Sequence, residues 1–310
     1  MRKPVIPVPA LAPASALVWW IVGYLAWIID GLGDGIDGVE IYSIASDAVT
    51  VPLLLPDLPH LVLGGAVGGI CAGLLTMVAD GQRTACLAAS FAGVACAVLL
   101  TGIQSTTALE KAGVRGYEGG DSFGPALIAM GAAASLVGWL LGAAAAYDRV
   151  PLGVGIAALS GAAPTWLAQL VFAIDRDSNS AFLSDVIQYA GAALLTLGLV
   201  TIGIGSYKRL LAWPVAIALA WLVYPAYSLI SFLGVDARWP GEMPDLIGRG
   251  WDIVKVSIPP QNNPIEMWFP FVLAIALALA ISVRLDMRRA AELDAHSPVE
   301  PSNNSRTTSM

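Results

Sequence analysis

Apolar runs of about 20 residues, separated by short polar stretches, recur along the whole chain. A helix rises about 1.5 Å per residue, so each run is long enough to cross a hydrocarbon core about 30 Å thick. The pattern predicts eight membrane-spanning helices, at residues 14–29, 61–79, 85–103, 126–147, 150–174, 186–206, 210–235 and 267–283. We therefore predict an all-α, polytopic helical membrane protein.

Polar segments divide this chain into three parts. Residues 14–283 form the predicted eight-span membrane domain, which follows a short lead at 1–13 and precedes a polar tail at 284–310. The Ser, Asn and Pro content of the tail predicts that it is disordered. The first and last pairs of spans are each joined by a long outer loop that contains proline. The polar stretch 104–124 forms a further predicted loop.

Segments inside the two long loops have the pattern of surface-lying structure. Residues 48–56 and 244–256 could lie flat on the membrane. In the second segment Leu246, Ile247 and Trp251 share one helical face and charged residues lie elsewhere, which is typical of an interfacial helix. The same pattern also fits an amphipathic lid that packs on the protein, and the sequence favours neither.

Composition removes the soluble alternative. The chain is 57% hydrophobic and 13% charged, whereas an ordinary globular domain has about 25% charged residues. Basic residues gather in the short loops on one side, which the positive-inside rule assigns to the cytoplasm. These residues are Arg2, Lys3, Arg83, Arg149, Lys208, Arg209, Arg284, Arg288 and Arg289. We predict that both termini are cytoplasmic, and the Ala- and Gly-rich spans indicate a bacterial plasma membrane.

Several chemistries lack the residues that they need. No predicted span has a charged residue well inside it, which disfavours a proton-driven pump. The two histidines, His60 and His296, cannot supply a bis-histidine haem site or a zinc cluster. No Gly-x4-Gly-Lys-Ser/Thr motif is present. We predict no cofactor, the lipid bilayer as a partner, and no nucleic-acid partner.

Small residues recur every four positions in two spans. Gly65, Gly69 and Gly73 lie on one helical face, and Gly138 and Gly142 lie on another. Such faces let helix backbones approach closely in a membrane. We predict internal helix packing, and the alternative is that these faces contact a protein partner.

The best candidate for a ligand cavity is the outer half of the fifth to seventh spans. Polar and aromatic side chains gather there at one predicted depth: Trp166, Gln169, Gln188, Tyr189, Tyr224 and Tyr227. Pro164 and Pro225 each free a backbone carbonyl nearby, as at helix breaks that line cavities. These groups suit a polar uncharged or amphiphilic ligand. Alternatively, the aromatic residues form an interfacial belt and the glutamines bridge helices.

The stretch 30–40 is rich in acids and glycines and has no basic residue near it in the sequence. Its carboxylates are Asp30, Asp34, Asp37 and Glu40. Hard cations bind carboxylate oxygens, but this spacing does not match the twelve-residue Ca²⁺ loop, so the four acids are weak metal candidates. The plain interpretation is a solvated, flexible outer loop.

An enzymatic interpretation of the same stretch rests on Asp34 and Asp37. An acid just beyond the first span is similar in position to the catalytic acid of membrane glycosyltransferases that use lipid-linked sugars. The similarity is one of position alone, and it implies an outer-face enzyme with Asp34 or Asp37 as base. We assign no catalytic residue on this ground.

Three functions remain compatible with the sequence. The tightly connected spans and the broken-helix region favour a permease-type transporter or an accessory subunit of a membrane assembly. The first alternative is the outer-face enzyme acting on a lipid-linked substrate. The second alternative is a membrane scaffold protein.

Overall fold

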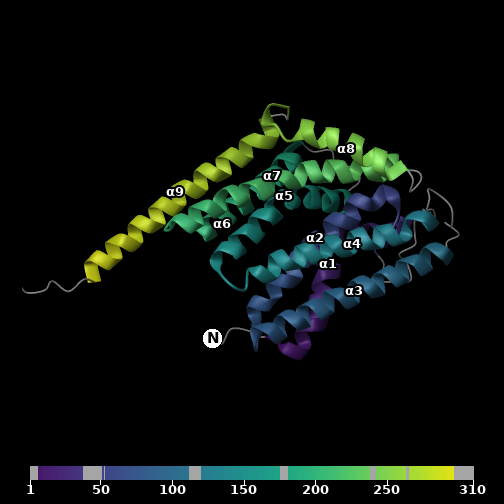
Figure 1. Cartoon of the computed structure of the whole chain (residues 1–310), viewed down its shortest axis with the longest axis horizontal. Coiled ribbons are helices and arrows are strands. Elements are labelled where there is room, and N and C mark those ends of the chain that lie inside the picture. Colours follow the sequence, from purple (N-terminus) through teal and green to yellow (C-terminus); the bar gives the residue numbers. More distant parts are fainter. Residues whose placement is uncertain are drawn as a thin grey trace, which may run out of the picture.

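Helices make up almost all of the computed structural model, which describes residues 6–37, 51, 53–111, 120–174, 181–237, 242–262 and 265–296 (Figure 1). The α-helices are α1 Val8–Asp37, α2 Leu58–Leu74, α3 Arg83–Lys111, α4 Gly120–Ala144, α5 Arg149–Ile174, α6 Ala181–Ile202, α7 Tyr207–Asp236, α8 Met243–Ser257 and α9 Ile265–His296. Short 3-10 turns accompany them in the described residues, at Leu55–Asp57, Leu75–Val78 and Pro260–Asn262. Strands β1 (Ile6–Pro7) and β2 (Ala79–Asp80) pair in parallel and tie the start of the chain to the end of α2.

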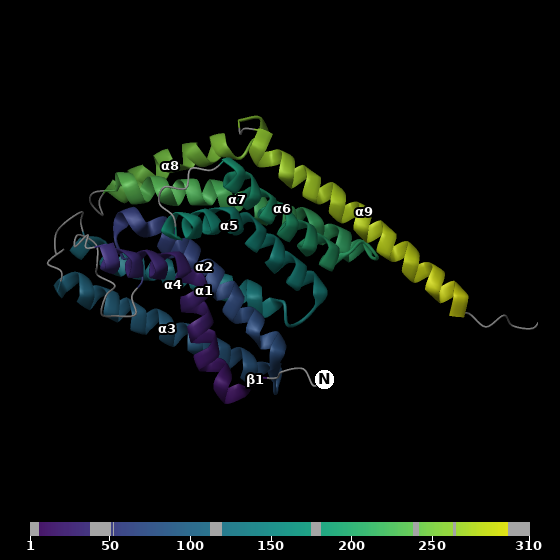
Figure 2. The same ribbon diagram turned by 180° about the vertical axis from the view of Figure 1, so that it is seen from behind.

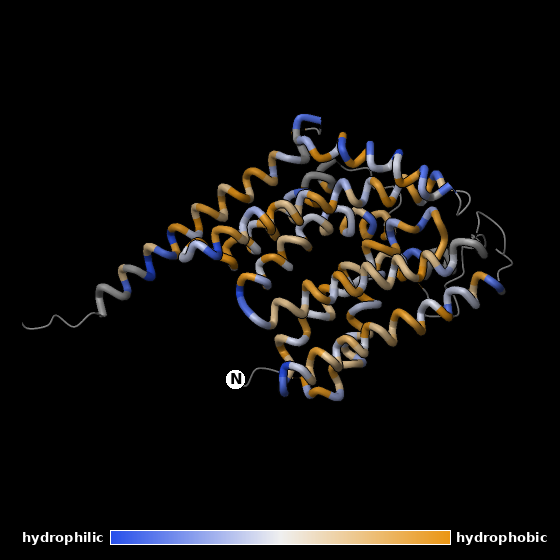
Figure 3. The backbone as a smooth tube through the Cα atoms, viewed as in Figure 1, coloured by the Kyte–Doolittle hydropathy of each residue, from blue (hydrophilic) through white to orange (hydrophobic). Residues whose placement is uncertain are grey.

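The lengths and apolarity of these helices confirm the predicted fold class. Seven of the described helices are long and apolar enough to cross a membrane. The remaining predicted span corresponds to α6, whose apolar part, Val186–Ile202, is shorter. Figure 3 shows hydrophobic residues through most of the helices and hydrophilic ones mainly near their ends and along α8. The molecule is an all-α polytopic membrane protein.

Four predicted helix ends are wrong, because the helices extend past their apolar parts. Helix α1 starts at Val8, inside the predicted lead, and continues to Asp37, through most of the stretch predicted as a loop. The predicted polar loop 104–124 is partly helical, since α3 runs to Lys111 and α4 begins at Gly120. Once a helix has formed, each further residue adds a hydrogen bond, so polar residues beyond the membrane can continue it.

Two groups of helices lie side by side in Figures 1 and 2: α1–α4, here the N-terminal half, and α5–α9, here the C-terminal half. One buried cluster lies mainly in the N-terminal half and includes Trp19 and Leu127. Another lies among α5, α6, α7 and α9 and includes Leu199 and Ala274. Leu246 of α8 joins the first cluster, so the two halves share part of their core.

Glycines of α2 permit close packing on two sides. A Cβ atom added to Gly68 would collide with the backbone carbonyl of Trp19 in α1. One added to Gly69 would collide with the backbone of Ser135 in α4, and one added to Gly73 would lie 2.6 Å from the backbone nitrogen of Ala143.

The partners on α4 are small for the same reason. Gly138 and Gly142 face the backbones of Ala66 and Ile70, and Gly65 lies against Ser135. The prediction of internal packing is confirmed. The alternative that these glycine faces contact a protein partner is wrong, because the α2 glycines are buried against α4.

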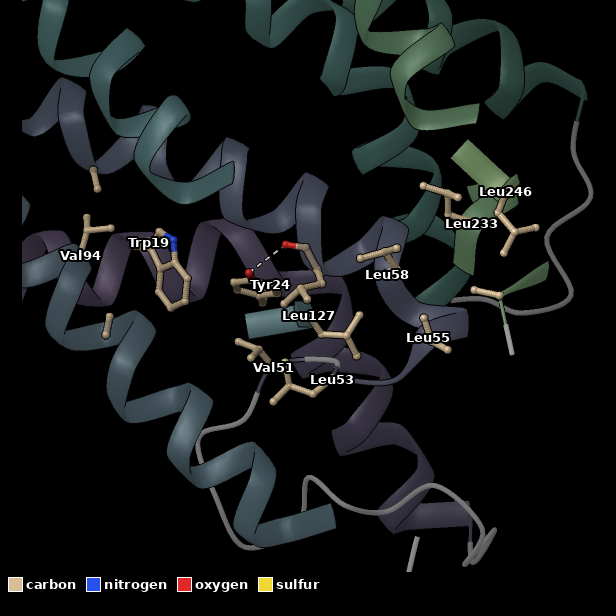
Figure 4. Close-up of a cluster of buried hydrophobic side chains, with 14 residues drawn as sticks. Trp19, Tyr24, Val51, Leu53, Leu55, Leu58, Val94, Leu127, Leu233 and Leu246 are labelled. Atoms are coloured by element: carbon tan, nitrogen blue, oxygen red, sulfur yellow. Dashed lines mark hydrogen bonds between the residues drawn. The ribbon is translucent and has the colours of Figure 1, made fainter. Parts of the chain in front are cut away.

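Polar side chains of α1 link it to its neighbours. Ser15 Oγ donates to Ser90 Oγ of α3, at 3.0 Å. Trp19 Nε1 donates to Ser135 Oγ of α4, at 3.0 Å. Tyr24 Oη donates to the Leu61 carbonyl of α2, at 3.0 Å, as Figure 4 shows. Because the alternative for each group is an unsatisfied position in an apolar interior, these bonds fix how α1 lies against the rest of the half.

The second surface-lying segment is a helix that packs on the protein. Helix α8 runs back along α7, and Trp221 Nε1 of α7 donates to the Ile258 carbonyl at 2.8 Å, just beyond the end of α8. Leu246 and Val254 are buried, whereas Ile247 and Trp251 are about half exposed. The helix is confirmed and it packs on the protein, and an apolar stripe that suits a membrane interface remains on its outside.

The first surface-lying segment does not lie on the surface where the structure describes it. Val51, Leu53 and Leu55 are buried, and the Val51 N–H donates to Ser105 Oγ of α3 at 2.8 Å. These three side chains of the segment join the buried cluster beside α1, α3 and α4, and Val51 and Leu53 line the groove there (Figure 4). The prediction that it lies flat on the membrane is therefore wrong for these residues.

Candidate functional site

One helix is kinked and two others contain an interior proline near the boundary between the halves. Helix α1 leaves helical geometry at Tyr24, which has φ −114° and ψ 23°. Helices α5 and α7 contain Pro164 and Pro225 in their interiors. A proline inside a helix removes one backbone N–H, and so the carbonyl four residues earlier loses its partner. Interrupted helices at membrane depth persist where the freed groups find other partners.

The kink in α1 and the two prolines lie close to one buried cluster. Its buried members are Leu63 and Val67 of α2 and Ala162 of α5. Partly buried side chains packed against them include Val22, Trp166, Val223 and Tyr227. We call this set of residues the seam cluster, because it joins α1 and α2 of the N-terminal half to α5 and α7 of the C-terminal half.

Two polar contacts accompany the seam cluster. Trp166 Nε1 donates to the Val22 carbonyl at 3.1 Å and lies 3.4 Å from the Gly23 carbonyl, just before the interruption at Tyr24. Gln169 Nε2 donates to Tyr227 Oη at 3.5 Å, between α5 and α7. The second contact is at the outer limit of a hydrogen bond, so it is weak. The three side chains and the two carbonyls are uncharged.

The predicted ligand-binding residues are only partly gathered. Trp166, Gln169 and Tyr227 lie together at the seam. Tyr189 and Tyr224 are 48% and 41% exposed, which suits a belt at the membrane surface. Gln188 of α6 is half-buried and is not a member of the seam cluster.

The two prolines are packed rather than open to a cavity. Pro225 is fully buried. A Cβ atom added to Gly191 of α6 would lie 2.8 Å from Pro164 Cγ and 2.9 Å from the Ser160 carbonyl oxygen, the carbonyl that Pro164 frees. The backbone of α6 therefore covers Pro164 and the carbonyl that this proline frees in α5.

The acidic stretch is only partly within the described structure. Asp30 is half-buried in the last third of α1. The side chains of Asp34 and Asp37, and the whole of Glu40, lie outside the described residues, so the metal and catalytic interpretations stay predictions. Among the residues whose side chains are described, no group of three or more His, Cys, Asp or Glu could hold a metal ion.

Sequence reasoning missed two features. One is the interruption of α1 at Tyr24, where no proline marks it. The other is a cavity of about 220 Å³ at the opposite end of the bundle, where α3 begins and α4 ends. Its lining residues Arg83 and Tyr147 are 64 positions apart in the sequence. The sequence signal that could have indicated this cavity is a basic residue at the end of one span and an aromatic residue at the end of another.

These observations define a polytopic helical membrane protein with an uncharged aromatic and polar seam between two groups of helices. Comparison of the chain with protein families, with curated proteins and with solved structures finds no match in any of the three. The argument for function therefore rests on the geometry of the chain itself.

Proposed function

We propose that this chain is a permease-type transporter whose two halves move against each other at the seam. The observation that supports this proposal is that α1 is kinked at Tyr24, and that α5 and α7 carry Pro164 and Pro225 in their interiors, where the halves meet. In many transporters, interrupted helices line the substrate site at the interface between two groups of helices. Trp166 and Gln169 would then face a polar uncharged or amphiphilic substrate.

The proposed topology has eight crossings. Helix α6 returns the chain from the end of α5 to the start of α7, so its 22 residues cross the layer although its apolar part is shorter. With the basic short loops inside, both termini lie in the cytoplasm of a bacterial cell and the seam contacts lie toward the outer side.

Distances across the seam test this proposal. Spin labels at Thr107 of α3 and Ile174 of α5 report on the two halves, and labels at Ile174 and Val235 of α7 report within one half. The native Cys71, Cys86 and Cys96 are first replaced by alanine. We expect two populated distances for the first pair in proteoliposomes and one distance for the second, measured by pulsed electron paramagnetic resonance.

The Trp166→Phe variant sharpens the test. It removes the indole N–H that reaches the Val22 carbonyl, so it should favour the longer distance between Thr107 and Ile174. A single, unchanged distance in the parent and in this variant would contradict movement at the seam and the transport proposal with it.

An accessory subunit of a membrane assembly is the second candidate. Helix α9 is 32 residues long and extends away from the other helices toward its C-terminal end (Figure 2). Phe269, Val272 and Leu277 of this helix are about half exposed. A rigid seam in the experiment above, together with this exposed helix, would favour the accessory subunit.

A further inference from the structure

The cavity at the start of α3 has the form of a small amphiphilic site. Met77, Leu87 and Ala146 give it apolar walls, and Thr76, Arg83 and Tyr147 bring polar groups. Its volume of about 220 Å³ is below the range of about 300–1,000 Å³ typical of pockets that enclose a drug-sized ligand. The cavity can therefore enclose one polar head, and any longer ligand must continue outside it.

Arg83 is the charged group of this cavity. Its guanidinium carbon lies 6.0 Å from the centre of the Tyr147 ring, in a cation–π arrangement that positions the charge at the cavity. Among the residues that the structure describes, no carboxylate forms an ion pair with Arg83. The nearby acids Asp80 and Asp148 are exposed and do not line the cavity. Within the described part of the chain, the cation of the cavity thus has no protein anion as its partner.

The depth of the cavity matches the surface of a bilayer. Arg83 is the first residue of the candidate span Arg83–Glu110, and Tyr147 follows the end of the candidate span Gly124–Ala144. Figure 1 shows the start of α3 and the end of α4 at the same end of the bundle. A ligand at Arg83 would therefore lie at the level of lipid head groups.

An apolar path leads from the cavity along the membrane face. Arg83, Leu87 and Phe91 are spaced four residues apart, so they follow one face of α3. Leu87 lines the cavity, and Phe91 is 45% exposed. The Phe91 ring lies 5.2 Å from that of Trp139 of α4, measured between ring centres. An acyl chain could follow this surface from the cavity toward the middle of the bilayer.

We propose that this cavity binds the head group of an anionic membrane phospholipid, with Arg83 contacting the phosphate and an acyl chain lying along Leu87 and Phe91. A basic pocket between membrane helices at the bilayer surface is suited to such head groups. The ordinary function of a basic residue at this position is only to orient the helices, and that function requires neither a cavity nor the apolar path. This site is independent of movement at the seam.

Lipid binding to the purified full-length chain in detergent tests the proposal. Native mass spectrometry would compare phosphatidylglycerol with phosphatidylcholine carrying the same acyl chains, since the second lipid has no net charge. We expect one phosphatidylglycerol to bind in preference. Arg83→Gln should weaken that binding about tenfold or more, because a hydrogen bond to a charged group is lost.

The matched control is Arg149→Gln, an exposed arginine near the same turn that does not line the cavity. It should leave phosphatidylglycerol binding unchanged. Equal losses in the two variants would show attraction by surface charge in general and would overturn the proposal. Equal binding of the two lipids to the parent chain would overturn it as well.

Two further experiments distinguish lipid binding from binding of a free anion and from a loss of folding. Inorganic phosphate alone should neither displace phosphatidylglycerol nor protect the chain against heat, and an effect equal to that of the lipid would assign the cavity to free phosphate instead. Ala146→Leu keeps Arg83 but fills the cavity, so it should also reduce lipid binding while gel filtration shows a folded protein. Retained binding in a folded Ala146→Leu variant would overturn the proposal even if Arg83→Gln fails to fold.

Discussion

Helices α1–α4 are joined by side-chain hydrogen bonds that pass from one helix to another, whereas α5, α6, α7 and α9 pack mainly through Ala, Gly and Leu. In the N-terminal half, Ser90 of α3 accepts from Ser15 Oγ at 3.0 Å and from Trp139 Nε1 at 3.1 Å. In the C-terminal half, Thr196 of α6 reaches the Ala274 carbonyl of α9 at 3.2 Å.

This difference bears on which half can move as a unit. A buried polar group requires its partner, so hydrogen bonds between helices hold one arrangement of α1–α4. Contacts among Ala157, Leu195 and Ala278 require complementary shape but no particular direction. The helices of the N-terminal half are therefore held in one arrangement by directional hydrogen bonds. The helices of the C-terminal half are held mainly by the fit of their shapes.

The largest expected effect concerns close backbone contacts, which both halves use. Gly138→Ala places a methyl group against the Ala66 backbone, and Gly161→Ala does the same against the Ala220 backbone. Overpacking against backbone cannot relax by side-chain rotation, so we expect each variant to lose about 3 kcal/mol of unfolding free energy. Thermal unfolding in detergent measures the loss.

Gly124→Ala is the matched control in α4, since nothing lies within 4 Å of an added Cβ atom there. Alanine is the better helix former, so this change should be neutral or stabilising by up to about 1 kcal/mol. If Gly138→Ala unfolds at the same temperature as Gly124→Ala, close packing between α2 and α4 does not stabilise the N-terminal half.

A medium effect should appear only in the N-terminal half. Ser90→Ala leaves the hydroxyl of Ser15 and the indole N–H of Trp139 without their acceptor, and Ser90 also loses its donation to the Ala72 carbonyl. Leaving buried polar groups unpaired should lower the unfolding free energy by about 2 kcal/mol. Chemical or thermal unfolding in detergent, followed by tryptophan fluorescence, measures the change.

Ser228→Ala provides the same substitution in α7. Its hydroxyl donates to the Tyr224 carbonyl within one helix, at 3.1 Å, and it links no neighbouring helix. We expect a change below about 0.5 kcal/mol, as for a surface position. A loss as large as that of Ser90→Ala would remove the distinction between the halves.

Sequence patterns were sufficient for the fold class because the bilayer sets the length of each apolar run. They were poorer at helix ends, since hydropathy marks the part in lipid and not the hydrogen-bonded helix, as α3 shows by running on to Lys111. The spacing of Gly65, Gly69 and Gly73 predicted close packing, but only the fold identifies α4 as the neighbour.

The candidate sites were harder to predict. Trp166, Gln169 and Tyr227 were singled out from their depth and polarity, yet the partner of Trp166 is a carbonyl of α1, 144 residues away in sequence. Backbone carbonyls are present at every position, so no pattern of side chains indicates which one is used. The apolar run at 51–55 suits either a membrane surface or a groove, and the fold places Val51 and Leu53 in the groove.

The smallest expected effect tests the single described hydrogen bond from Thr196 to α9. Thr196→Val keeps the shape of the side chain and removes its donation to the Ala274 carbonyl, which is a weak bond at 3.2 Å. Hydrogen bonds between membrane helices contribute about 0.6 kcal/mol on average, so we expect a loss of that order. Thr201→Val is the control in α6, because Thr201 donates only to Leu197 of its own helix. If Thr196→Val destabilises the protein as much as Ser90→Ala does, the C-terminal half also depends on directional hydrogen bonds. The proposed movement at the seam would then have to leave those bonds intact.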